Sequence, residues 1–283
     1  MHAQSDAPGW YRRKSGLRAA PLVVRLCFHD GEHDLITFSA VSGHEWAIIA
    51  VAALLLGMQK TGVQGVAMMI IPVLASVFGG RVSAGLVLPM LSFADIAALR
   101  YYHRSANWKH VFRVLPATVV GIVIGAIIGN RISDRAFVRT IGICVMVSLA
   151  ILVYNEYVRR EVTIPDWRWF APLIGLSGGF ATMIGNASPA IMALYLLSMR
   201  LPKQNYIGTG AWFYFFNNMI KIPFHVLLWG TITLDTLAVN AVVAPLILVG
   251  AMVGVRIVRR IPEKPYRAFI VTVTFLASLR LFF

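Results

Sequence analysis

The sequence predicts an all-α polytopic membrane protein made of two inverted repeats, each with a broken-helix hairpin plus three transmembrane helices. Three observations predict it: long apolar segments between short basic gaps, two polar glycine-rich breaks, and a proline–glycine pattern that occurs twice. The 283 residues are 58% hydrophobic and 13% charged, whereas soluble domains are about 45–50% apolar and about 25% charged. This composition excludes an ordinary soluble enzyme and, over most of the chain, a disordered protein. The two cysteines are too few for a disulfide scaffold.

The charge lies mainly after residue 45. Residues 1–45 carry five basic and five acidic side chains, so the net charge of +14 comes from the rest of the chain. A basic balance can indicate nucleic-acid binding. Here the basic residues lie in short gaps between apolar runs, as in the loops of membrane proteins. We therefore expect membrane lipid around the chain and no nucleic-acid partner.

Residues 1–45 are predicted to form a polar tail. Their apolar stretch, residues 19–28, is interrupted by Pro21 and Arg25 and is too short to span a membrane. No small-residue cleavage site of a signal peptide follows a clean apolar run. The spacing of the histidines and acidic residues in this tail is too loose to predict a metal site. They are His29, Asp30, His33, Asp34 and His44.

Ten apolar segments follow the tail. They span 46–58, 65–79, 82–99, 110–130, 136–156, 169–183, 188–199, 205–228, 236–256 and 265–282. Five or six of them are long enough for the roughly 20 residues that a helix needs to cross the hydrocarbon. The four short segments form two pairs. A glycine-rich break at 57–65 joins the first pair, and residues 185–189 join the second.

Such paired breaks predict a transporter. Backbone groups freed by a break cannot face lipid and must be buried in protein or line a wet cavity. Interrupted helices in corresponding positions of two halves indicate the binding site of a transporter. A P-x4-G-x3-G pattern begins at Pro116 and again at Pro245, 129 residues later. We therefore predict a first repeat at 46–156, a linker at 157–168 and a second repeat at 169–283.

The basic gaps predict the orientation. If each broken pair is a re-entrant hairpin, the gaps at 100–113, 157–168, 200–204 and 256–267 share one face and hold 14 basic residues. The positive-inside rule places that face in the cytoplasm. Each half then crosses three times, which inverts one half relative to the other and places the tail outside. If each broken pair crossed once, the 256–267 gap would fall outside. The opposite face carries Arg81, Arg131, Arg135, Arg139 and Arg280.

Three ionisable residues lie within the predicted membrane region: Lys60, Asp95 and Lys221. Such a group costs about 2.5–3.5 kcal/mol at mid-membrane and usually marks a pathway. Two lysines against one carboxylate leave a positive site, and helix N-termini at the breaks add N–H donors. These features favour a small anion. The alternatives are snorkelling of the lysines to an interface and a structural salt bridge for Asp95.

The candidate site residues come from the breaks and from segment 205–228. The breaks supply neutral donors, and Trp212 is a candidate pocket wall because it precedes two asparagines by one to two turns; core packing is the alternative for this aromatic residue. The substrate-binding candidates are Gln59, Lys60, Gln64, Asn186, Ser188, Trp212, Asn218 and Lys221. Asp95 is the candidate for proton coupling, because a buried carboxylate can titrate near neutral pH.

Two other functions are compatible with parts of the pattern. A passive anion channel needs the same charges. An intramembrane serine hydrolase is a second alternative, since residues 175–179 match G-x-S-x-G and Ser177 could act with His225. That motif normally requires a strand-to-helix turn, and glycines at a broken helix explain it equally well. No zinc-protease or nucleotide-binding motif occurs, so we expect no enzyme and no cofactor.

Several motifs resemble those of a known family. The first half has Lys60-Thr61-Gly62, Pro72, the stretch 88–95 (LPMLSFAD), Trp108 and Leu115-Pro116. The second half has 179–189 (GFATMIGNASP), Tyr195-Leu196-Leu197, Leu201-Pro202-Lys203, Gly208-Thr209, Trp212-Phe213 and 218–223. Over residues 46–283 the chain resembles the TauE/SafE family of the sulfite exporter superfamily.

The resemblance implies a multi-pass secondary transporter of the bacterial inner membrane with inverted repeats. It also implies a sulfur-containing anion as substrate, either sulfite or an organosulfonate such as sulfoacetate or isethionate. Together with the residues above, it leads us to expect a proton as coupling ion and rocking of the two halves. A homodimer is left open.

Overall fold

The computed structural model describes residues 36–59, 66–157, 169–199, 201–258 and 263–282. Within these residues the secondary structure is helical, with no strand. The first five helices are α2 (Gly43–Gln59), α3 (Val66–Phe78), α4 (Gly80–Tyr102), α5 (Trp108–Arg131) and α6 (Asp134–Tyr157). The next five are α7 (Phe170–Gly185), α8 (Ser188–Ser198), α9 (Lys203–Pro223), α10 (Leu234–Val258) and α11 (Glu263–Leu279). Each predicted apolar segment corresponds to one helix, which confirms the all-α polytopic fold.

Four of the described helices are long and apolar enough to cross a membrane: α4, α5, α6 and α10. The prediction of five or six segments of sufficient length is confirmed, since α9 is also long enough, but α9 is less apolar than the other four. Helix α9 has 21 residues, but its last turns carry two asparagines and Lys221, which lower its hydropathy. Helix α11 is shorter, with 17 residues.

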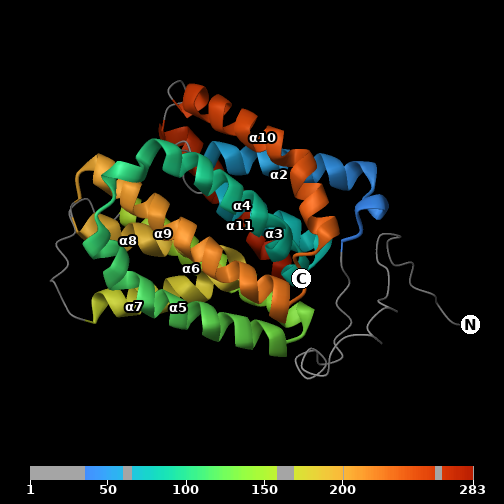
Figure 1. Cartoon of the computed structure of the whole chain (residues 1–283), viewed down its shortest axis with the longest axis horizontal. Helices are drawn as coiled ribbons and strands as arrows, with labels where there is room; N and C mark the ends of the chain where they lie inside the picture. Colours follow the sequence, from blue (N-terminus) through green and yellow to red (C-terminus); the bar gives the residue numbers. More distant parts are fainter. Residues whose placement is uncertain (1–35, 60–65, 158–168, 200, 259–262, 283) are drawn as a thin grey trace, which may run out of the picture.

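The helices form two units, and each unit packs helices against helices of the other. The first unit contains α2–α6 and the second contains α7–α11. Helix α2 packs along α10 at one edge of the bundle, and α7 packs along α5 at the other, with α4 and α9 between these pairs (Figure 1). The first helix of each unit therefore lies against the fourth helix of the other.

Glycines make this packing close and reciprocal. A Cβ atom at Gly121 of α5 would lie 2.2 Å from the carbonyl oxygen of Leu176 in α7. A Cβ atom at Gly250 of α10 would lie 2.0 Å from the carbonyl oxygen of Leu54 in α2. The two glycines are 129 residues apart and the two leucines 122 residues apart, so the contacts are equivalent. Small residues permit such an approach between membrane helices.

Glycines of α2 and α7 make the reverse contacts, each against a carbonyl oxygen of its partner helix. A Cβ atom at Gly57 would lie 2.0 Å from the carbonyl oxygen of Ile247, and one at Gly179 would lie 2.2 Å from that of Thr118. Again 122 residues separate the glycines and 129 separate their partners. Two independent contact pairs therefore support a duplicated unit, while the inversion of one unit across the membrane stays a prediction.

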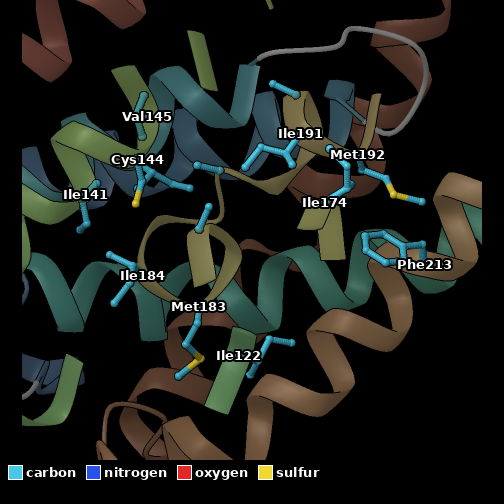
Figure 2. Packing of buried hydrophobic residues seen from close by; sticks show 14 of the residues in the cluster. Ile122, Ile141, Cys144, Val145, Ile174, Met183, Ile184, Ile191, Met192 and Phe213 are labelled. Atoms are coloured by element: carbon cyan, nitrogen blue, oxygen red, sulfur yellow. The ribbon is translucent and has the colours of Figure 1, made fainter. Parts of the chain in front are cut away.

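Two apolar clusters fill the bundle. One gathers side chains of α2, α4 and α10 together with Ile36. The other surrounds the break between α7 and α8, where side chains from α5, α6, α7, α8 and α9 meet (Figure 2). The described end of the tail is packed, since Ile36 is buried and the rings of Phe38 and Trp46 lie 5.5 Å apart. The limits of the tail, repeats and linker stay a prediction; residues 1–35 and 158–168 lie outside the described residues.

An arginine closes one end of the first unit. Arg81 is buried, and its Nε donates to the carbonyl oxygen of Gly129 at 2.8 Å. Its Nη2 donates to the carbonyl oxygen of Ile132, and its guanidinium lies 5.4 Å from the ring centre of Phe137. The start of α4 is thereby tied to the end of α5, where carbonyl groups carry partial negative charge.

The close approach of α5 and α7 predicts a stability difference between two glycine variants. Gly179→Ala should lower the free energy of unfolding by about 1–3 kcal/mol, because its methyl group must displace the backbone of α5. Gly210→Ala in α9 is the matched control, since its Cβ would meet side chains only at 3.5 Å and beyond. Thermal unfolding in detergent measures both; equal midpoints would contradict the packing.

Candidate functional site

The break between α7 and α8 consists of two residues. Helix α7 ends at Gly185, and Asn186 adopts the left-handed conformation with φ 49°. Among the described residues it is the one non-glycine residue with positive φ, and asparagine tolerates this region better than most residues. Helix α8 restarts at Ser188, followed by Pro189, which suits the first turn of a helix because it has no N–H group.

Side chains of other helices satisfy the backbone at the break. The hydroxyl of Ser148 in α6 donates to the carbonyl oxygen of Ala187 at 2.8 Å. The ammonium group of Lys221 in α9 donates to the carbonyl oxygen of Thr182 at 3.3 Å. The carbonyl oxygen of Thr182 also accepts from the backbone N–H of Asn186 at 3.1 Å. Because a membrane interior supplies no water, these added bonds stabilise the break where it lies.

Lys221 has further bonds at the same place. Its side chain is 1% exposed, and its Nζ donates to the hydroxyl of Thr182 at 3.2 Å and to Oδ1 of Asn186. The ammonium group is therefore buried at the break and does not snorkel to an interface. A positive charge held there polarises the amide of Asn186.

Asp95 lies between the two units. The Nδ2 of Asn218 in α9 donates to Oδ2 of Asp95 in α4 at 2.5 Å, and both side chains are buried. The residues are 123 positions apart, close to the offset of 122 between the equivalent residues of α2 and α7. The hydrogen bond thus joins nearly equivalent positions of α4 and α9.

A small cavity connects these features. It has a volume of about 30 Å³, enough for at least one water molecule. It lies where the end of α2, the α7–α8 break, α4 and α9 meet. Its lining residues are Gln59, Leu91, Thr182, Asn186, Pro189, Tyr214, Asn217 and Asn218.

Unpaired polar atoms surround this cavity. Within the described part of the chain, both amide atoms of Asn217, Oε1 of Gln59 and the hydroxyl of Ser188 are buried without a hydrogen-bond partner. Each such group costs about 1–3 kcal/mol when it stays unpaired. Asn217 offers one donor and one acceptor whichever way its amide is oriented. This set indicates a place for a polar ligand.

Sequence reasoning missed Asn217 as a site residue. The sequence places Asn217 and Asn218 side by side, and hydropathy does not say which of two adjacent asparagines faces a cavity. Of the predicted residues, Gln59, Asn186 and Asn218 line the cavity. Lys221 does not line the cavity but donates to two residues that do, Thr182 and Asn186. Ser188 is buried at the start of α8.

Of the other predicted binding residues, only Trp212 lies within the described residues. Trp212 packs in an aromatic cluster, with its ring centre 4.9 Å from that of Trp108 and 5.6 Å from that of Phe216. It is not among the residues that line the cavity. Lys60 and Gln64 lie outside the described residues, in the first break, directly after Gln59.

The residues of the hydrolase alternative have different partners. The hydroxyl of Ser177 donates to the carbonyl oxygen of Leu173 at 2.8 Å, one turn earlier in its own helix. His225 is buried, and its Nδ1 lies 2.9 Å from the hydroxyl of Thr231. The geometry gives no support for a serine–histidine pair.

Most of the histidines and acidic residues of the tail lie outside the residues that the structure describes. His29, Asp30, His33 and Asp34 fall in residues 1–35. In the described ranges, no group of three or more His, Cys, Asp or Glu side chains is placed to hold a metal ion.

A family model now places the chain among known proteins. The model for the sulfite exporter TauE/SafE matches residues 47–281. The chain belongs to the TauE/SafE family. It is therefore a multi-pass membrane transporter, and the resemblance found in its motifs is confirmed. No curated protein and no solved structure matches the chain.

Two adjacent asparagines provide a test of the site. Asn217→Leu should leave the free energy of unfolding unchanged or raise it, because the amide has no protein partner to lose. Asn218→Leu should lower it by about 1–3 kcal/mol, because the buried Asp95 carboxylate loses a donor. Thermal unfolding of both variants in one detergent measures the difference. A larger loss for Asn217→Leu would show that its amide is bonded within the protein.

Proposed function

We propose that this TauE/SafE protein is a secondary transporter that moves a small sulfur-containing anion across the bacterial inner membrane, with a proton as coupling ion. The anion is sulfite or an organosulfonate such as sulfoacetate or isethionate. The observation that carries the proposal is the cavity at the meeting point of α2, the α7–α8 break and α9, with the unpaired amide of Asn217 in its lining.

The chemistry of the lining favours an oxyanion. Since Oδ1 of Asn186 accepts from Lys221, the amide of Asn186 has its two N–H groups left for a ligand. The N-terminus of α8 adds partial positive charge beside Pro189. Asn217 adds another N–H donor, and the buried Lys221 charge offsets the negative charge of an anion. Lys60 in the first break is our candidate for a second cation.

Asn217 also presents a carbonyl oxygen, which a deprotonated oxyanion cannot satisfy. The hydroxyl group of a hydroxysulfonate such as isethionate, or a water molecule bound with the anion, would donate to it. A set of donors together with the acceptors Oδ1 of Asn217 and Oε1 of Gln59 therefore suits an anion that carries a hydroxyl group or binds with water.

The position of the cavity supports alternating access. The two units contact each other along α4 and α9 beside the cavity. Rocking of one unit against the other around this contact would open the site to each side in turn.

Transport in proteoliposomes tests the function. Labelled sulfite, sulfoacetate and isethionate should enter with saturation and in response to a pH gradient. Asn217→Leu, or Lys60→Met with Lys221→Met, should reduce uptake by about tenfold or more, since charged hydrogen bonds are worth about 1.5–3 kcal/mol each. The exposed Lys109 provides the control Lys109→Met.

The possible outcomes separate the alternatives. Linear, uncoupled flux would identify a passive channel. Undiminished uptake by the double lysine variant would rule out the proposed site.

The coupling role of Asp95 gives a separate prediction. Asp95→Asn keeps the size of the side chain but cannot bind and release a proton. We expect this variant to exchange labelled substrate across the membrane but to lose accumulation driven by a pH gradient. Uptake with and without the gradient measures this. A variant that accumulates substrate like the unmodified protein would exclude Asp95 as the proton carrier.

A further inference from the structure

A second cavity, of about 350 Å³, lies at one end of the bundle. It is formed where α3 ends, where α6 begins, and beside the short helix η5 (Arg280–Phe282) that follows α11. Its polar lining residues are Ser76, Asp134, Arg135 and Arg280. The transport cavity has no lining residue in common with it.

The carboxylate in this lining is already engaged. Asp134 accepts from the backbone N–H of Gly80 at 3.3 Å and from that of Arg81 at 3.5 Å. These groups belong to the N-terminus of α4, which carries partial positive charge. The carboxylate therefore stabilises a helix end.

Unlike the Asp134 carboxylate, the two arginine side chains of the lining have no bonding partner in the described part of the chain. Among the residues that the structure describes, the side chains of Arg135 and Arg280 have no hydrogen bond and no ion pair. Both are exposed and both line the cavity, so the cavity has two guanidinium-bearing residues in its wall. A guanidinium binds the oxygens of a phosphate with two parallel hydrogen bonds.

Packing holds Arg280 at the cavity. Its neighbour Leu281 is buried. A Cβ atom at Gly142 would lie 3.0 Å from the ring of Phe282, so this ring packs directly on α6. Helix η5 is thereby fixed against α6, which keeps Arg280 in the same cavity wall as Arg135.

The helices around the cavity present apolar faces. Val73 of α3, Ile143 and Val147 of α6, and Leu276 and Leu279 of α11 are exposed. Side chains of this kind face the acyl chains of a bilayer. A cavity with two arginines at the end of such faces has the layout of a site for a lipid headgroup.

We propose that this cavity binds the phosphate group of an anionic phospholipid, with Arg135 and Arg280 as its ligands. The acyl chains lie along the exposed faces of α6 and α11. A free phosphate has the same charge and oxygens but gains nothing from these apolar faces, which is why the lipid is the occupant.

The test compares lipids on the purified full-length protein. Native mass spectrometry and thermal unfolding in detergent are measured with phosphatidylglycerol, with phosphatidylcholine, and with inorganic phosphate or glycerol 3-phosphate. We expect phosphatidylglycerol to bind and raise the unfolding temperature more than phosphatidylcholine, and the free phosphates to have little effect. Equal binding of the two lipids overturns the proposal, and an equal shift with inorganic phosphate identifies a free-anion site instead.

Variants locate the site. Arg135→Gln with Arg280→Gln should weaken phosphatidylglycerol binding by about tenfold or more. Arg131→Gln with Arg139→Gln is the control, since these exposed arginines belong to the same predicted face but do not line the cavity. Equal loss in both pairs indicates non-specific charge and contradicts the proposal. If the glutamine pair does not fold, Arg135→Lys with Arg280→Lys keeps the charge but not the two-pronged bond, and unchanged binding there contradicts it.

Discussion

The buried ammonium group of Lys221 ties α9 to the break between α7 and α8. A broken helix inside a membrane is stable only where its polar groups are bonded within the protein, and Lys221 adds such bonds to the carbonyl oxygen of Thr182 and to the side chain of Asn186. Ser148 does the same from α6. The position of the break, and therefore of the cavity beside it, depends on these bonds between helices.

The reciprocal packing of the two units determines where that cavity forms. Each unit lays its first helix along the fourth helix of the other, and glycines bring the backbones into contact. The end of α2 and the break after α7 are thereby brought to one region, with α4 and α9 between them. At that centre Asp95 and Asn218 join the units by one hydrogen bond. A contact of this kind can be remade when the units move, which suits a transporter.

Much of the fold was predictable because membranes impose strong patterns. Each apolar segment forms a helix. The spacing of 129 residues between Pro116 and Pro245 also separates Gly121 from Gly250, whose equivalent close contacts the sequence alone does not reveal. The site was predicted less completely. Asn186 and Asn218 were identified, but Asn217 was missed as a site residue and Trp212 packs among aromatic rings. Helical phase alone does not say which polar side chain meets a cavity formed by several helices.

Hydropathy, glycine and proline spacing, and the rare charges were sufficient to predict a membrane protein with two related halves and a polar centre, since these features depend on the cost of polar groups in lipid; that this centre binds an anion is our proposal. The partners of each polar group followed only from the packed helices. That Lys221 bonds to Thr182 and Asn186, that Asp95 meets Asn218, and that Arg135 and Arg280 share a cavity are contacts between segments distant in the chain. Such contacts depend on how whole helices fit together, which no local pattern of residues encodes.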